Sequence, residues 1–156
     1  MLEDGLSFEQ VMSKLEPLMA SARIFFTVGS LDYLQMGGRI GKVATAATGK
    51  LGVKPVIVMK DGDIGLGGIG RNRNKLKASV LQAAKKYLDE NGKDNFIVSV
   101  GYGYDKEEGF QFMNEVESAL DVKLNTETNV AIGIVSAVHT GPYPIGLGVI
   151  RKYETL

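Results

Sequence analysis

The one histidine of the chain, His139, lies between a run of apolar residues and a turn rich in glycine and proline, in the stretch SAVHTGPYPIGLGV at positions 136–149. At a strand end, such a histidine could be a general base, a metal ligand, a partner for an acidic ligand or a structural residue. No second histidine and no cysteine is present to share a metal ion. No motif such as G-x-S-x-G indicates a nucleophile. Binding of an acidic head group and a structural role therefore remain.

Three arginines form a second group of candidate residues. The stretch GRNRNK at positions 70–75 places Arg71 and Arg73 just before a predicted helix. Guanidinium groups and backbone N–H groups at such a position can hold a phosphate or a carboxylate-rich partner. In MGGRIGK, at positions 36–42, Arg39 stands between glycines that let a backbone approach a ligand closely. For all three arginines, a solvated basic turn is the alternative.

The stretch GLGGIG at positions 65–70 formally matches the dinucleotide-binding motif G-x-G-x-x-G. That motif needs a strand that leads into the glycines and a helix that opens on them. Here the glycines lie on the return arm of a predicted hairpin, and Asp89 and Glu90 fall at a helix end instead of after a second strand. A glycine-rich strand under close packing is favoured, and a nucleotide-binding enzyme is kept as an alternative.

Strands and helices alternate along the chain and must position these residues. Strands are predicted at 23–28, on both sides of the Asp61-Gly62 turn, at 95–103, at 129–138 and at 146–153, and 122–127 is compatible with a short one. The strand at 129–138 is expected to be central and buried.

Helices are predicted from sequence signals at their ends. A capping box, Ser7 with Gln10, begins the first helix, which Pro17 is expected to kink or split. Two short helical pieces joined at Gly37-Gly38 follow, the second at 40–51. Later helices begin with Asn74 or Asp105 as cap, and Gly92 ends the first of these two.

This alternation, with one hairpin that forces an antiparallel pair, predicts a single α/β domain over residues 1–156, with a mixed (parallel plus antiparallel) sheet and packed helices. Lys plus Arg and Asp plus Glu each number 18, so bulk charge indicates no nucleic acid. The absence of cysteine excludes disulfides, thiolate zinc sites and iron–sulfur clusters. The acidic N-terminus and the short apolar runs predict a cytoplasmic protein without stable membrane insertion.

Four stretches, FFTVGSLDYLQMGGRIGK, LGVKPVIVMKDGDI, GRNRNK and HTGP, occur in an order and spacing that resemble the DegV family of bacterial fatty-acid-binding proteins. The resemblance runs from about Leu2 to the end of the chain and covers only the second of the two domains of that fold. It implies that the N-terminal domain, which supplies Ser and Thr hydroxyls to the carboxylate of the ligand, is absent from this sequence. A truncated domain would expose apolar surface, and we expect the fragment to self-associate.

The resemblance also implies roles for single residues. His139, with Thr140 and Gly141, would meet the head group of a long-chain fatty acid. Arg39 and Arg71, with Arg73 beside them, would face a fatty acid kinase that converts the bound carboxylate to an acyl phosphate for phospholipid synthesis. The chain would then be a lipid-binding and presenting protein, not an enzyme, with no cofactor besides its ligand. A plain protein-interaction domain that docks a partner through its arginine turns is a further alternative.

Local position alone identifies the candidates to line an acyl chain, with ordinary core as the alternative. They are Phe26, Leu34, Ile40 and Val43. The sequence also departs from the family pattern at two places. Ile69-Gly70-Arg71 stands where the family often has Lys-Val-Arg, and Tyr143 stands where a glycine often follows His-Thr-Gly-Pro. The tyrosine is expected to narrow the head-group region or to change the turn.

Overall fold

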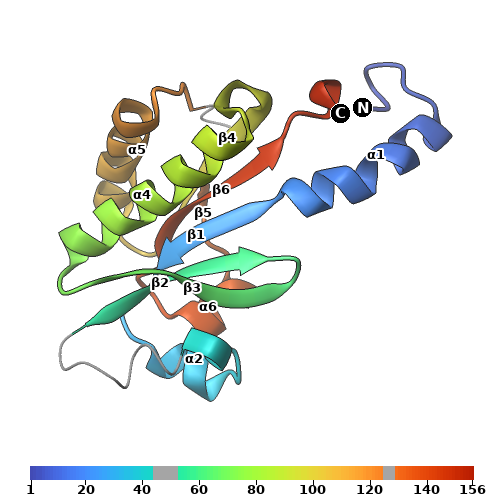
Figure 1. Cartoon of the computed structure of the whole chain (residues 1–156). Coiled ribbons are helices and arrows are strands. Elements are labelled where there is room, and N and C mark those ends of the chain that lie inside the picture. The colour runs from blue at the N-terminus through green and yellow to red at the C-terminus, as the bar shows by residue number, and fades with distance from the viewer. Residues whose placement is uncertain (44–52, 125–128) are drawn as a thin grey trace.

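A computed structural model describes residues 1–43, 53–124 and 129–156. In these ranges the chain forms a six-stranded sheet of order β3-β2-β1-β6-β4-β5 (Figure 1). The strands are β1 (Arg23–Thr27), β2 (Lys54–Lys60), β3 (Asp63–Gly70), β4 (Phe96–Tyr102), β5 (Val130–Ala131) and β6 (Ile145–Arg151). Neighbours pair antiparallel, except for β4 and β5, which are parallel. The predicted α/β fold with a mixed sheet is confirmed.

Two long helices, α4 (Arg73–Asn91) and α5 (Lys106–Leu120), cover one face of this sheet (Figure 1). The main core lies between them and the strands, because alternate strand residues point to this face. Its buried members are Phe25, Val56, Leu76, Val80, Ala84, Leu88, Phe96, Val98, Val100, Phe112, Val116, Leu120, Leu124, Ile145, Leu147 and Val149.

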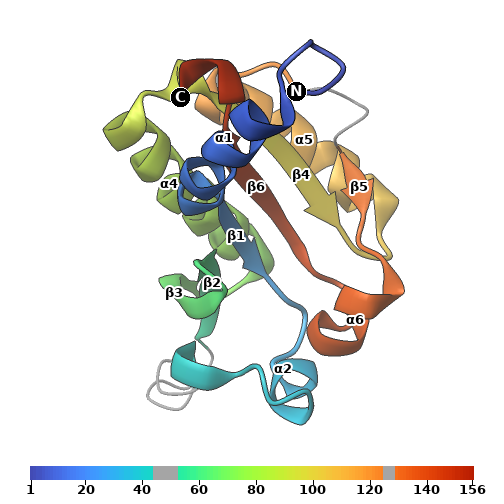
Figure 2. The ribbon, with the colours of Figure 1, turned by 90° about the vertical axis from the view of Figure 1, so that its right-hand side faces the viewer.

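The opposite face is covered only in part. The short helices α2 (Asp32–Met36) and α6 (Ile134–Thr140) contact each other at one end of the sheet, at the bottom of Figure 2, and the 3-10 turn η1 (Gly41–Val43) follows α2. A smaller core cluster forms there. It consists of Phe26, Val28, Leu34, Val43 and Ile57.

The rest of this side is here called the open face. It is formed by Ile24 and Phe26 of β1, Ile97, Ser99 and Gly101 of β4, and Gly146, Gly148 and Ile150 of β6. The side chains of Ile24 and Ile97 are each 44% exposed. A broad apolar sheet surface is therefore left without a covering layer in the described part of the chain.

Local sequence signals fix several helix ends. In α1 (Phe8–Ser21), the Ser7 hydroxyl accepts from the Gln10 backbone N–H at 3.3 Å and the Gln10 side chain accepts from the Ser7 N–H at 2.7 Å, which confirms the capping box. The helix is one element that includes Pro17, so the expected split does not occur. The cap of α4 is Asn72, which accepts from Lys75 N–H at 2.9 Å, and the predicted cap Asn74 lies inside the helix.

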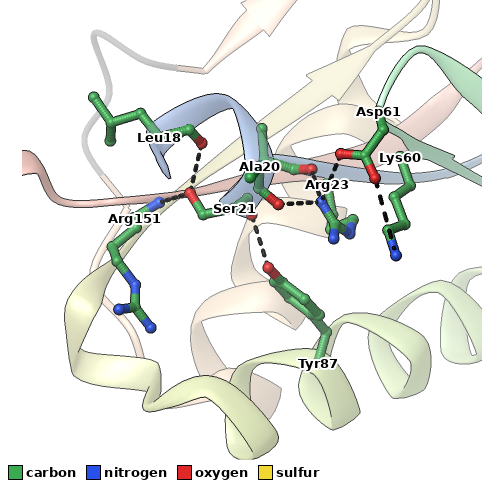
Figure 3. A network of polar contacts seen from close by, with 9 residues as sticks. Leu18, Ala20, Ser21, Arg23, Lys60, Asp61, Tyr87 and Arg151 are labelled. Carbon is green, nitrogen blue, oxygen red and sulfur yellow. Dashed lines mark hydrogen bonds and ion pairs between the residues drawn. The ribbon is translucent and has the colours of Figure 1, made fainter. Parts of the chain in front are cut away.

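A polar network ties the end of α1 to the sheet and to α4 (Figure 3). The Ser21 hydroxyl accepts from the Arg151 N–H at 3.0 Å, and the Ser21 carbonyl accepts from the Tyr87 hydroxyl at 2.8 Å. Arg23 donates to the carbonyls of Ala20 and of the C-cap residue Ala22, at 2.8 and 2.6 Å. Its Nη1 also lies 3.9 Å from a carboxylate oxygen of Asp61 in the β2–β3 turn. These contacts fix the orientation of α1 relative to the sheet.

The segments at the two ends of the chain also contact each other. The Tyr153 hydroxyl, in the 3-10 turn η4 (Tyr153–Thr155), donates to Asp4 at 2.7 Å. This hydrogen bond raises the pKa of Tyr153 to about 12. Lys14 of α1 donates to the carbonyls of Tyr153 and Leu156, at 3.1 and 3.0 Å. The two terminal segments are thereby held together.

The predicted central strand at 129–138 is wrong. Only Val130–Ala131 is strand, at the edge of the sheet, and Gly133 caps the N-terminus of α6, so His139 lies in the last turn of a helix. A short apolar run has no period that separates strand from helix, which explains the error. Of the predicted helix at 40–51, residues 41–43 form η1 and 44–51 lie outside the described residues. Of the short strand considered at 122–127, residues 122–124 are not strand, and residues 125–127 lie outside the described residues.

Candidate functional site

An apolar groove of about 260 Å³ crosses the open face. Its lining comprises Ile24, Phe26, Met59, Ser99, Val100, Gly101, Val130, Ile132, Ser136, Thr140, Pro144, Gly146, Leu147 and Gly148. Small residues form its floor, since Gly101 pairs with Gly146 and Ser99 pairs with Gly148 across β4 and β6. The groove therefore exists because neighbouring strand positions on this face carry almost no side chain.

The walls and one end of the groove come from other elements. Phe26 and Ile24 of β1 lie beside Gly146 and Gly148 in the strand register and form one wall. Ser136 and Thr140, four residues apart on one face of α6, bring hydroxyl groups to the end near Pro144. The Thr140 hydroxyl donates to the Ser136 carbonyl at 3.1 Å. The groove is thus apolar along its length and carries hydroxyl groups at one end.

His139 lies next to this end but is not among the lining residues. Its Nδ1 is buried and has no hydrogen-bond partner among the described residues. The ring packs on Gly37 of the α2 C-cap, where a Cβ would collide with Nδ1. Gly141, with φ of 74°, ends α6, and its N–H donates to the Ala137 carbonyl at 2.8 Å. Of the three predicted head-group residues, which are consecutive in the chain, only Thr140 lines the groove.

A second cavity, here called the basic pocket, has a volume of about 280 Å³. Its lining comprises Val28, Gly29, Lys54, Arg71, Asn72, Arg73, Leu76, Glu108 and Tyr143. Arg73 forms a bidentate pair with Glu108, with both N–O distances 2.7 Å, while its Nη1 is buried without a partner in the described chain. Lys54 donates to the Gly29 carbonyl at 2.6 Å. Three cations face one carboxylate, so the pocket is electropositive.

The predicted arginine surface is only partly assembled. Arg71 and Arg73 share the basic pocket, and Arg71 is exposed. Arg39 is exposed too but is not a lining residue, and its Nη1 donates to the Gly37 carbonyl at 2.6 Å. Because Arg73 is held by Glu108, Arg71 is the arginine of this pocket that a partner can reach most readily.

The turn at 141–144 separates the two cavities. Pro144 lines the groove, whereas Tyr143 lines the basic pocket. Tyr143 packs on Gly29, where a Cβ would lie 3.1 Å from the tyrosine Cβ, and its ring stands at 89° to that of Tyr104 at a centroid distance of 6.5 Å. The tyrosine that departs from the family pattern is therefore a wall of the basic pocket.

The four residues predicted to line an acyl chain occupy different environments. Phe26 lines the groove and also belongs to the smaller core cluster. Leu34 and Val43 are buried in that cluster, and Ile40 packs against it, but none of these three lines the groove. The last three residues are therefore part of the ordinary core.

The glycines of GLGGIG lie inside β3, where Gly65, Gly68 and Gly70 pair with β2 and Gly67 falls at a shift in the register. A dinucleotide motif needs these glycines in the turn between a strand and a helix. That context is not found here. Within the described ranges, no set of three or more acidic, histidine or cysteine side chains could hold a metal ion. Searched over the same residues, no helix is long and apolar enough to cross a membrane.

Within the described residues, fold and cavities define an α/β domain with an apolar groove on the open face and an electropositive pocket beside it. Residues 1–152 match the family described as "Uncharacterised protein, DegV family", and the chain belongs to the DegV family.

Curated relatives agree with this assignment. A DegV domain-containing protein of Clostridium perfringens is 32% identical over 152 residues, which cover 97% of this chain and 52% of the relative. One of Deinococcus radiodurans is 30% identical over 146 residues, or 92% of this chain and 50% of the relative. The chain thus spans about half the length of the curated relatives it matches.

Two solved structures are especially informative. A protein from Eubacterium ventriosum described as a stearic-acid-binding protein is 92% identical and superposes with a TM-score of 0.97, over all of this chain and 53% of its own. A DegV family protein from Thermus thermophilus, described by its fatty-acid binding, is 29% identical with a TM-score of 0.82, over 97% of this chain and 53% of its own.

The sequence signal for the groove was missed. Ser99, Gly101, Gly146 and Gly148 alternate with large apolar residues along two strands. Small residues that alternate in neighbouring strands indicate a sheet face that leaves room for something else. Which strands are neighbours is a property of the fold, so this signal could be recognised only once β4 and β6 were known to pair.

Proposed function

We propose that this chain binds a long-chain fatty acid, with the acyl chain in the groove of the open face. The observation that carries the proposal is the apolar groove itself, in a chain 92% identical to a protein described as stearic-acid-binding. Burial of each methylene contributes about 0.8 kcal/mol, so an acyl chain is the ligand that such a groove favours. The chain would hold and present the ligand, without catalysis of its own.

The groove would be one wall of a larger site. Its volume of about 260 Å³ is below the roughly 300–1,000 Å³ of ordinary ligand pockets, which enclose most of their ligand. Next to it, Ile134 and Val135 of α6 are 80% and 81% exposed, which is unusual for apolar residues of a folded domain. We propose that the half of the relatives' chain without a counterpart here, the predicted N-terminal domain, supplies the second wall.

The head group would lie at the α6 end of the groove. A carboxylate that leaves water needs hydrogen-bond donors, and Thr140 has a hydroxyl there. To donate to the ligand, this hydroxyl would have to give up its bond to the Ser136 carbonyl. His139 would contribute through Nε2, because Nδ1 is enclosed against Gly37. The role of Gly141 would be conformational, since its N–H is already bonded and its positive φ turns the chain out of α6.

The test uses the completed polypeptide, meaning this chain joined to the remaining half of the Eubacterium ventriosum relative as the two halves are joined in that protein. We expect mass spectrometry of the purified, denatured polypeptide to detect a long-chain fatty acid in near-stoichiometric amount. Recovery of no acyl species would overturn the proposal. The isolated chain should bind far more weakly, because one wall is absent, and submicromolar affinity for it would contradict that view.

A fatty acid kinase is the proposed partner, in a cytoplasmic route to acyl phosphate. The support is the position of the basic pocket, on the other side of the turn that ends the groove. Replacing Arg71 with Ala should lower kinase-dependent acyl-phosphate formation and leave the fatty-acid content unchanged. Arg39→Ala tests the second predicted contact in the same assay. If acyl phosphate still formed at the full rate with both replacements, these arginines would not contact the kinase, and that part of the proposal would fail.

A further inference from the structure

Three strand glycines line the groove, and none of them is required by backbone conformation. Gly101 of β4 and Gly146 and Gly148 of β6 are absent from the residues with positive φ. Glycine inside a strand is unfavourable, because it loses more conformational freedom on folding and packs no side chain. The space that a Cβ would find at each position separates the three glycines. At Gly101 a Cβ would lie 3.5 and 3.6 Å from Ile132 Cγ1 and Cδ1, so a methyl group there would pack against the Ile132 side chain.

Gly146 is explained by the fold. A Cβ at this position would collide with the carbonyl oxygen of Phe25 and the Cβ of Phe26 on the paired strand β1. Only glycine permits the close approach of β1 and β6 at this point. Gly146 is therefore a structural residue, whatever the groove binds.

Gly148 is different. The nearest atoms to a Cβ at this position are the Arg23 carbonyl oxygen and Ile24 Cγ1, both at 3.9 Å, which is ordinary van der Waals contact. A Cβ would fit the protein, and the side chain it begins would stand on the open face, because Leu147 and Val149 point into the main core. This side chain would occupy the groove. Packing within the fold therefore does not explain why residue 148 is glycine, whereas the need to keep the groove floor empty does.

Gly148 lies at the end of the groove away from the hydroxyl groups. It follows Pro144 by four strand positions, which corresponds to about 13 Å along β6 at ~3.3 Å per residue. Beyond it, Ile97 and Ile150 pair across β4 and β6, and both are absent from the groove lining. Gly148 is thus the last floor position before large side chains close the row.

We infer that Gly148 determines how long an acyl chain the groove accepts, an inference that rests on the proposed function. A side chain at this position would shorten the groove from its far end and leave the hydroxyl end unchanged. Long acyl chains would lose buried methylenes, whereas shorter ones would keep theirs. The expected penalty is about fourfold in affinity for each methylene that is excluded.

The experiment compares octanoic, lauric, palmitic and stearic acid binding to the completed polypeptide with and without Gly148→Val. We expect stearic acid to lose at least tenfold in affinity, with octanoic acid, which is too short to reach Gly148, changed less than twofold, so that the preference moves to shorter chains. The matched control is Gly65→Val, the same change at a strand glycine of β3 that also has room for a Cβ but lies outside the groove. It should leave the profile unchanged.

The outcomes separate the inference from the proposed function. If Gly148→Val weakens all four acids equally, or leaves the profile as it was, Gly148 does not set chain length, while fatty-acid binding stands. If the unsubstituted polypeptide binds none of the acids, the proposed function itself fails. Should the valine variant not fold, as circular dichroism would show, Gly148→Ala replaces it, with a smaller shift in the same direction expected and an unchanged profile again contradicting the inference.

Discussion

His139→Phe separates the two roles that the sequence leaves open for the histidine. In the folded protein the Nδ1 atom is buried against Gly37 without a hydrogen-bond partner in the described chain. An unsatisfied buried polar atom costs about 1–3 kcal/mol. Phenylalanine keeps an aromatic ring and removes that atom. Because the imidazole as a whole is only half-buried, we expect the free energy of unfolding to be unchanged or higher by about 1 kcal/mol.

Fatty-acid binding should change in the opposite direction. A hydrogen bond to a charged carboxylate contributes about 1.5–3 kcal/mol, which corresponds to a roughly 10- to 150-fold loss of affinity. Urea unfolding of the isolated chain measures the first quantity, and titration of stearic acid into the completed polypeptide measures the second. Gly37→Ala is a companion variant that keeps the imidazole but displaces it, so it should weaken binding and also lower stability. If His139→Phe lowered stability by about 2 kcal/mol and left binding intact, His139 would be a structural residue.

Three further predictions follow from the packing and the exposed surface. Gly146→Ala should destabilise the chain by about 1–3 kcal/mol in urea unfolding, because the added methyl overpacks the approach of β1 and β6, and an unchanged midpoint would contradict the close contact. Glu108→Gln should cost about 2 kcal/mol, between the values for surface and buried pairs, because it breaks a bidentate pair with Arg73 whose side chains are 20% and 28% exposed. The control for this variant is Asp89→Asn, which breaks an exposed ion pair with Lys85 and should cost less than about 0.5 kcal/mol; an equal loss for the two variants would contradict the expectation for Glu108. The isolated chain should self-associate through its open face, so sedimentation velocity should show a larger species as concentration rises, and a monomer at every concentration would contradict this.

Local signals in the sequence predicted much of the fold. The Ser7–Gln10 capping box, the Asp61-Gly62 turn with φ of 53° and 80°, and Asp105 as a cap are interactions between residues close in the chain, so each could be recognised without the tertiary structure. The run at 129–138 could not, because its residues are apolar throughout and no period distinguishes strand from helix. That error also placed His139 at a strand end instead of a helix end.

The candidate site depends on contacts between distant residues and was predicted only in outline. Arg71 and Arg73 are neighbours in sequence, and their shared position was foreseen, but the Glu108 partner of Arg73 lies 35 residues away on another helix. Likewise, Leu34 and Val43 carry the apolar character of a lining residue, yet the packing of α2 and η1 on β1 and β2 encloses them in the core. Sequence position alone cannot tell an apolar residue of a groove from one of a core.

The most direct test of the groove is to locate the acyl chain in the completed polypeptide. A fatty acid with a photoreactive diazirine at its terminal carbon can be crosslinked after binding and mapped by mass spectrometry. The groove predicts labelling at the far end of the open face, near Gly148 and Ile24, with the carboxylate left beside Thr140. Labelling confined to α4, α5 or the β3 glycines, with the open face unmodified, would contradict the central claim.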